Sequence, residues 1–230
     1  MGRLTTFVVS LALVVGLFGQ HPEQQQRFVT SGLDPQISRI AVIGDSYTTG
    51  VLLGGMGPRN WAPLAFQELA ERGVQVDADV VAEGGSGYFA RGNQGGIFAD
   101  LTPRAVRPDD ALVVFFGSRN DKDADLRAFT RLSHDALTRA RQAAPTARIL
   151  VIGPPWVNAD VPPNLLGVRD ILREQAWQVG ATFHDPIAEG WFFDRPELIA
   201  VDGIHPTDAG HAYLADKIAP LIDAELPHWV

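Results

Sequence analysis

The stretch Arg39-Ile-Ala-Val-Ile-Gly-Asp-Ser-Tyr-Thr-Thr-Gly50 decides the fold of this chain. Its four consecutive apolar residues, Ile40–Ile43, are typical of a strand that is buried on both faces, as in a parallel sheet. Gly44 ends this run, and Ser46 follows just beyond the carboxyl end of the predicted strand. Open α/β sheets bind their ligands in the crevice outside the strand carboxyl ends, so Ser46 is a candidate nucleophile. The same residues also fit an ordinary strand-to-helix turn, with Asp45 or Ser46 as the helix cap.

The composition indicates one folded domain and narrows the class of partner. The chain has 230 residues, 46% of them hydrophobic, which is enough for one sizeable α/β core. Its formal charge of −8, with no basic run, argues against a nucleic-acid partner because phosphate neutralisation needs clustered Lys and Arg. There are no cysteines, which excludes disulfides, thiolate metal sites and a cysteine nucleophile.

The N-terminus carries an apolar run from Leu4 to Gly19 after a single basic residue, Arg3. We interpret residues 1–19 as an export signal or, if uncleaved, as an N-terminal membrane anchor. The run is shorter than the roughly 20 residues that cross a bilayer comfortably, which favours the cleaved signal. Residues 20–36 are polar and Gln-rich and are predicted to form a linker before the folded domain at 37–230. The expected location is therefore extracellular or in the cell envelope, with membrane attachment through residues 4–19 if they are retained.

Strand and helix patterns alternate through the folded domain. Strands are predicted over 39–43, 74–82, 111–116, 148–152 and 181–184, and helices over 61–72, 125–144, 165–179 and 212–226. Such alternation predicts an α/β fold with a parallel sheet flanked by helices on both faces. The expected architecture is a three-layer α/β/α sandwich around a central, mostly parallel five-stranded sheet.

Polar groups follow the ends of several predicted strands. The second strand ends in Glu83-Gly84-Gly85-Ser86-Gly87, whose glycines let backbone N–H groups approach a ligand closely, although a flexible turn has the same composition. Asn120 and Asp121 follow the third strand.

Asp202 and His205 precede the last helix, for which Thr207 is the expected N-cap. A local hydrogen bond within a turn is the alternative interpretation of this D-x-x-H pair. His134, on the polar face of its helix, is expected to be a surface residue, and His211, inside the last helix, is expected to be structural.

Together these groups match what hydrolysis of an acyl ester requires. A serine must be deprotonated by a histidine, a carboxylate must hold that imidazole in the correct tautomer, and hydrogen-bond donors must stabilise the oxyanion. The candidates for these roles are Ser46, His205, Asp202, the glycines around Gly84, and Asn120.

On these residues the sequence resembles the SGNH, or GDSL-like, hydrolase family over about residues 39–224. The first block of the family matches Gly44-Asp45-Ser46, and the fifth matches Asp202-Gly203-Ile204-His205-Pro206. The resemblance implies that Ser46 is the nucleophile, His205 the base and Asp202 its orienting carboxylate. It also implies an oxyanion hole made by the backbone of Ser46 and Gly84 and the side chain of Asn120.

Two blocks depart from the family pattern. Ala82 replaces the usual asparagine before the second-block glycine, which leaves the choice between Gly84 and Gly85 open. In the third block Gly117 lies three residues before Asn120, one more than in the family, so a different loop geometry is expected there.

The expected function is therefore a serine esterase that acts on short-chain acyl esters or carbohydrate O-acetyl esters, with no cofactor and no metal. The partner is then a small-molecule or glycan ester. A lipase-like or lysophospholipase-like enzyme and a catalytically silent binding protein for cell-envelope glycan are the alternatives. A nucleotide-binding domain is disfavoured because no strand is followed by G-x-G-x-x-G or a P-loop.

Overall fold

The Ile40–Ile43 run forms the middle of a central strand, β2 (Ser38–Gly44), with a parallel partner on each side. The computed structural model describes residues 25–29 and 37–227. The remaining strands are β1 (Gln25–Val29), β3 (Val76–Ala82), β4 (Leu112–Phe116), β5 (Arg148–Ile152) and β6 (Thr182–His184). The helices are α1 (Ser46–Thr49), α2 (Trp61–Glu71), α3 (Phe98–Ala105), α4 (Leu126–Ala143), α5 (Pro163–Gln178) and α6 (Asp208–Glu225).

The sheet runs in the order β1-β3-β2-β4-β5-β6, and the five strands from β2 to β6 are parallel, as expected. The sixth strand, β1, pairs antiparallel with β3 at the edge. The prediction of a linker throughout residues 20–36 is therefore wrong for Gln25–Val29. An edge strand is held by backbone hydrogen bonds to its neighbour, which a polar sequence can also make. The remainder of the predicted linker and the apolar run at 4–19 lie outside the described residues.

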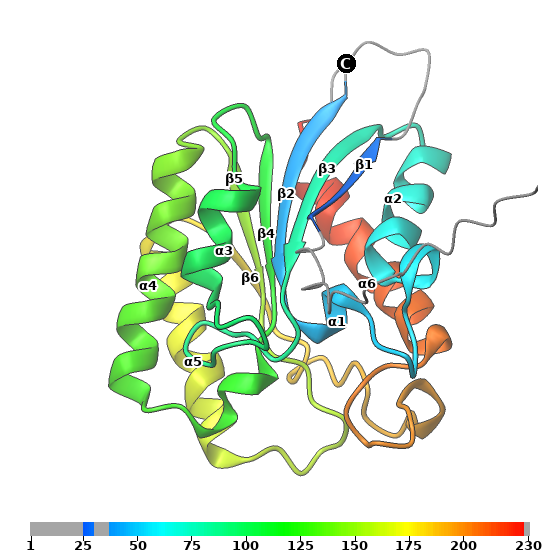
Figure 1. Ribbon diagram of the computed structural model, residues 1–230, viewed down its shortest axis with the longest axis vertical. Helices are drawn as coiled ribbons and strands as arrows, with labels where there is room; N and C mark the ends of the chain where they lie inside the picture. Colours follow the sequence, from blue (N-terminus) through cyan, green and yellow to red (C-terminus); the bar gives the residue numbers. More distant parts are fainter. Residues whose placement is uncertain (1–24, 30–36, 228–230) are drawn as a thin grey trace, which may run out of the picture.

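Alternate residues of each central strand face two separate cores, which confirms the three-layer α/β/α fold. In β2, Ala41 and Ile43 join the core under α3, α4 and α5, whereas Ile40 and Val42 join the core under α2 and α6. Figure 1 shows these two helical layers on opposite faces of the sheet. All four side chains are fully buried, which explains why the strand has no polar alternation.

Helix boundaries follow local signals where those signals exist. The side chain of Thr207 accepts a hydrogen bond from Gly210 N–H and caps α6, as predicted. His211 is buried in α6 and its Nδ1 lies 3.3 Å from the Trp61 N–H. Burial lowers the pKa of His211 to about 4, so this ring is a neutral structural acceptor, as expected. No helix was expected at α3, where Pro103 lies inside the helix and glycines precede it.

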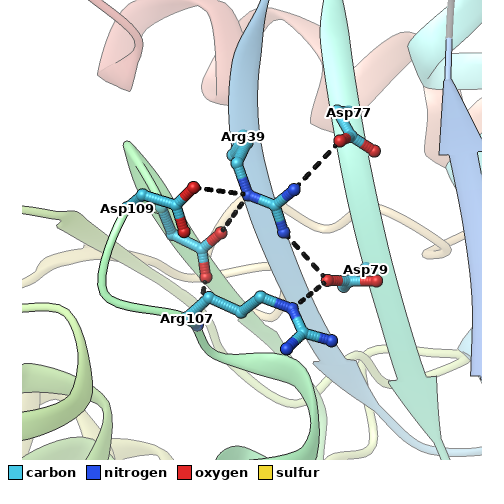
Figure 2. A network of polar contacts seen from close by, with 6 residues as sticks. Arg39, Asp77, Asp79, Arg107 and Asp109 are labelled. Atoms are coloured by element: carbon cyan, nitrogen blue, oxygen red, sulfur yellow. Dashed lines mark hydrogen bonds and ion pairs between the residues drawn. The ribbon is translucent and has the colours of Figure 1, made fainter.

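A network of charged side chains joins the amino-terminal halves of the central strands (Figure 2). Arg39 of β2 reaches Asp77 Oδ2 at 3.0 Å and Asp79 Oδ2 at 3.1 Å, both on β3. Asp79 is buried and also accepts a hydrogen bond from Arg107 Nε at 3.0 Å. The ion pairs therefore compensate the negative charge of a carboxylate that is buried in the sheet.

Among the residues that the structure describes, no helix combines the length and apolar character needed to cross a bilayer.

Replacement of Arg39 by Ala is expected to lower the free energy of unfolding by about 3 kcal/mol, because it leaves a buried carboxylate with only one cationic partner. Urea denaturation at pH 7 measures this loss. Arg139→Ala is the matched control, since it removes an exposed helical ion pair with Asp135 and should cost less than about 1 kcal/mol. Equal losses in the two variants would contradict this account of the network.

Candidate active site

Three chain segments bring the predicted catalytic residues to the carboxyl edge of the sheet. Ser46 begins α1 immediately after β2, and Asn120 lies in a 3₁₀ helix (Arg119–Asp123) that follows β4. Asp202 and His205 lie in the loop before α6. Figure 1 shows α1 at the end of β2, beneath the sheet.

A continuous line of hydrogen-bonding groups joins Ser46, His205 and Asp202. The Nε2 atom of His205 lies 3.1 Å from Ser46 Oγ, and its Nδ1 atom lies 2.6 Å from Asp202 Oδ2. The structure thus brings together two parts of the chain that are 159 residues apart in the sequence. These distances are within the range in which a histidine accepts a proton from a serine hydroxyl.

The Asp202 carboxylate is held in place by backbone N–H groups as well as by the imidazole of His205. Its Oδ1 atom accepts hydrogen bonds from the N–H groups of Ile204 and His205, at 2.9 and 3.0 Å. Desolvation opposes ionisation, but these bonds and the His205 side chain outweigh it and lower the pKa of Asp202 to about 2. Asp202 is therefore ionised near neutral pH and favours the tautomer in which His205 Nδ1 carries the proton.

Two residues outside the predicted set hold the histidine loop in place. The hydroxyl of Tyr47 donates to the Ile204 carbonyl at 2.5 Å, and the guanidinium of Arg119 donates to the same oxygen at 3.1 Å. Burial raises the pKa of Tyr47 to about 12, so its hydroxyl remains a donor. Tyr47 comes directly after Ser46, so the segment that carries Ser46 also positions the loop that carries His205.

The side-chain amide of Asn120 contacts the segments that follow β2 and β3. Its Nδ2 atom donates to Ser86 O at 2.8 Å and to Asp45 Oδ2 at 3.3 Å. The expected glycine, Gly84, lies instead beside Asn93, and its carbonyl accepts the Asn93 N–H. The role of Gly84 stays a prediction. Gly87 follows the residue that contacts Asn120, but its N–H already donates to Ala90 O.

Asp121 fixes the turn that carries Gly87. Its buried carboxylate accepts hydrogen bonds from the N–H groups of Tyr88, Phe89 and Ala90 at 2.7–3.0 Å, and from the Ser118 hydroxyl. A Cβ atom at Gly87 would come within 2.6 Å of the Asp121 and Ser118 side-chain oxygens, so only glycine fits there. The altered spacing between Gly117 and Asn120 thus places Ser118 under this turn as a further donor.

Asp45, which directly precedes Ser46 in the chain, is buried. Its Oδ1 atom caps α1 by accepting the Tyr47 N–H at 2.9 Å, and its Oδ2 atom contacts Asn120. Burial raises the pKa of Asp45 from its usual 3.8 to about 7, and the nearby Asp121 carboxylate adds to the shift.

A pocket of about 380 Å³ flanks the loop that carries Asp202. It is lined by Ala200 and Gly203 of this loop, by Asp194 and Arg195, and by Asn158 of the segment after β5. Neither His205 nor any residue of the turn at 84–87 is among its lining residues. Within residues 25–29 and 37–227, no group of three or more His, Asp or Glu side chains is arranged to hold a metal ion.

Residues 42–213 match the model of the GDSL-like lipase/acylhydrolase family. The chain belongs to this family. A GDSL lipase, Rv0518 of Mycobacterium tuberculosis, is 53% identical over 229 residues, which cover 98% of this chain and 99% of the relative. The resemblance drawn from Ser46, Asn120 and the Asp202/His205 pair is thereby confirmed, and this GDSL-like protein is an ester hydrolase.

Solved structures of hydrolases share the fold of this GDSL-like protein at low identity. A lipase/acylhydrolase from Enterococcus faecalis is 18% identical with a TM-score of 0.63, and the match covers 84% of this chain and all of the other. A family two carbohydrate esterase from Clostridium thermocellum is 18% identical with a TM-score of 0.64, covering 85% of this chain and 66% of the other.

The buried Asp45 is expected to make stability depend on pH. Because its folded-state pKa is raised, the stability it contributes is complete below pH 3.8 and is lost as the pH rises through about 7. Asp45→Asn keeps a capping oxygen but cannot ionise. Between pH 4 and 7, the free energy of unfolding should therefore fall by up to about 4 kcal/mol less in Asp45→Asn than in the parent protein. This figure follows from the size of the pKa shift, since each pKa unit corresponds to about 1.4 kcal/mol.

Denaturation by urea at several pH values gives the free energy of unfolding as a function of pH. The slopes of the variant and the parent are compared, so a constant difference in stability between the two proteins has no effect on the result. Asp160→Asn, at an exposed position, is the control and should retain the slope of the parent. An Asp45→Asn slope equal to that of the parent would exclude Asp45 as the titrating group.

Proposed function

We propose that the chain hydrolyses carboxylic esters through an acyl-enzyme, with Ser46 as nucleophile, His205 as general base and Asp202 as its orienting carboxylate. The observation that carries this proposal is the line of short contacts from Ser46 Oγ through both nitrogens of His205 to Asp202. Each group lies within reach of the atom with which it would exchange or share a proton.

In the first half-reaction, Ser46 Oγ attacks the carbonyl carbon of the ester and its proton passes to His205 Nε2. Asp202 stabilises the imidazolium that forms. The tetrahedral intermediate then collapses, the bond to the alcohol breaks, and His205 returns the proton to the leaving alcohol. Water, deprotonated by the same histidine, next attacks the acyl-enzyme and releases the acid with Ser46 restored.

The oxyanion needs donors that are already in place. Ser46 is the first residue of α1, where backbone N–H groups have no partner within the helix, and its N–H is the first donor. Asn120 is the second, and the oxyanion would replace its longer bond, the one to Asp45. The third donor is a backbone N–H of the turn at 84–87, from Gly84 as the family resemblance implies or from Gly85, because the Gly87 N–H already donates to Ala90 O.

Asn120→Ala is expected to lower kcat about 10²- to 10³-fold, because loss of one oxyanion donor commonly raises the barrier by about 2.7–4 kcal/mol. Steady-state hydrolysis of 4-nitrophenyl acetate measures the effect. Gln142→Ala removes an amide from an exposed position on α4 and is the control that should keep the parent rate. An unchanged rate in Asn120→Ala would remove Asn120 from the site.

For the substrate we propose short-chain acyl esters, including O-acetyl groups on carbohydrate. The solved relatives by fold include carbohydrate esterases and an acetyl xylan esterase, which supports this class. The name of the M. tuberculosis relative, a lipase, supports the alternative of longer acyl chains. The pocket lined by Asn158, Asp194 and Arg195 borders the loop that carries Asp202 and His205, and we propose it as a site for the alcohol part of the ester.

The ratio of kcat/KM for the acetyl and octanoyl esters of 4-nitrophenol distinguishes these classes. We expect the acetyl ester to react faster, since a short acyl group needs no long apolar cleft to hold it. A clear preference for the octanoyl ester would overturn the short-chain assignment and favour a lipase-like enzyme.

A further inference from the structure

Exposed apolar side chains gather on the loops that carry the active site. Eight large hydrophobic residues are exposed in the described part of the chain, and six of them lie on loops at the carboxyl edge of the sheet. We call these six the apolar rim: Leu52, Leu53, Met56, Phe89, Val201 and Ile204. Leu52 and Val201 are almost fully exposed, at 95% and 98%. Single exposed apolar residues are ordinary, but a group on one functional edge indicates an interaction surface.

Contacts within the structure hold the loops of the apolar rim together around the catalytic histidine. Val51 and Gly54 pair across a tight turn with Leu52 and Leu53 at its tip. Gly54 lies against the loop that follows His205, since a Cβ there would be 2.4 Å from Pro206 O.

The remaining members are adjacent to the same machinery. Val201 and Ile204 flank Asp202, and the Ile204 carbonyl accepts the Tyr47 hydroxyl. Phe89 follows the turn at 84–87, and its N–H donates to Asp121. The apolar rim therefore draws its residues from three separate loops and is not a property of one loop.

The other two exposed hydrophobic residues lie at the opposite edge. Ile37 precedes β2, and Trp177, which is 74% exposed, lies near the end of α5 just before β6 begins. Both are therefore near the amino-terminal ends of the parallel strands. Among the described residues these two are the large exposed hydrophobics outside the apolar rim, and they belong to different elements.

The point at which the chain enters the sheet lies on the same edge as the active site. Because β1 is antiparallel to β3, its first residue, Gln25, pairs with Val81, and Val81 pairs with Ile43, three residues before Ser46. Two strand spacings place Gln25 only about 10 Å from Ile43. The five residues 20–24, which separate the apolar run at 4–19 from Gln25, span at most roughly 18 Å even when fully extended. A bilayer that held this run would therefore lie close to the catalytic edge.

From these two independent observations we infer that the apolar rim docks on a lipid bilayer, so that Ser46 meets esters presented at a lipid surface. Transfer of a side chain of leucine size from water to lipid favours binding by about tenfold to a hundredfold, so a few such residues are sufficient. The formal charge of −8 disfavours attraction to anionic headgroups, so apolar burial would drive docking to neutral lipid. The inference rests on the proposed ester hydrolysis at Ser46 but not on the length of the acyl chain, and docking is measured without turnover.

The absence of cysteines allows a clean test on the full chain. Leu52→Cys and Val201→Cys, each labelled with the environment-sensitive fluorophore NBD, report on the apolar rim, and Trp177→Cys reports on the opposite edge. All three are compared in buffer and with phosphatidylcholine vesicles that carry spin labels in their acyl chains. Each is prepared with Ser46 intact and in Ser46→Ala.

We expect vesicles to shift the emission of the probes at 52 and 201 to shorter wavelength and the spin labels to quench it, with no change at 177. This result would stand even if Ser46 proved inactive, so docking and hydrolysis fail separately. If the probes at 52 and 201 kept the emission wavelength that they have in buffer, and were not quenched, when vesicles were present, the inference would be overturned. Probes already shielded in buffer, in a chain that sediments as a dimer, would also overturn it and assign the apolar rim to a second copy.

Discussion

The parallel pairing of β2 with both β3 and β4 is the constraint on which the site depends. In this register Gly44 lies opposite Ala82 on one side and Phe116 on the other. Three strands thus end level with one another, and the residues that follow them are delivered to one edge of the sheet. Ser46, the glycine turn and Asn120 each come two to five residues after those matched positions. The fully buried β2 side chains stabilise the register from both faces, because a shift by one residue would exchange the two cores.

Buried polar groups fix the orientation of the residues that this register brings together. Asp121 accepts the backbone N–H groups of Tyr88, Phe89 and Ala90, just after the glycine turn, while Asp45 both caps α1 and contacts Asn120. Tyr47 and Arg119 share one carbonyl of the histidine loop. Buried carboxylates are costly unless they are hydrogen-bonded, and here their partners are the loops that carry the reacting groups. Burial raises the pKa of both Asp45 and Asp121, which is the energetic consequence of placing them there.

Much of this arrangement could be predicted from the sequence because its signals are local. The apolar run before Ser46, the helix cap at Thr207 and the spacing of Asp202 and His205 each occupy a few adjacent residues. Gly87 could not be singled out, since its need for glycine comes from Asp121 and Ser118, which are more than thirty residues away. Strand β1 was missed because its pairing depends on the free edge of β3 and not on its own apolar content. Helix α3 was missed because Pro103 and the glycines before it are typical of a loop.

The central claim is that His205 activates Ser46 toward an electrophile, and covalent labelling tests it most directly. A fluorophosphonate probe forms a stable bond only with an activated serine, and intact mass with peptide mapping locates the adduct. This account predicts one adduct per chain, on Ser46, and its loss in His205→Ala with the protein still folded by circular dichroism. A folded chain that remains unlabelled, or that is labelled equally well without His205, would contradict it.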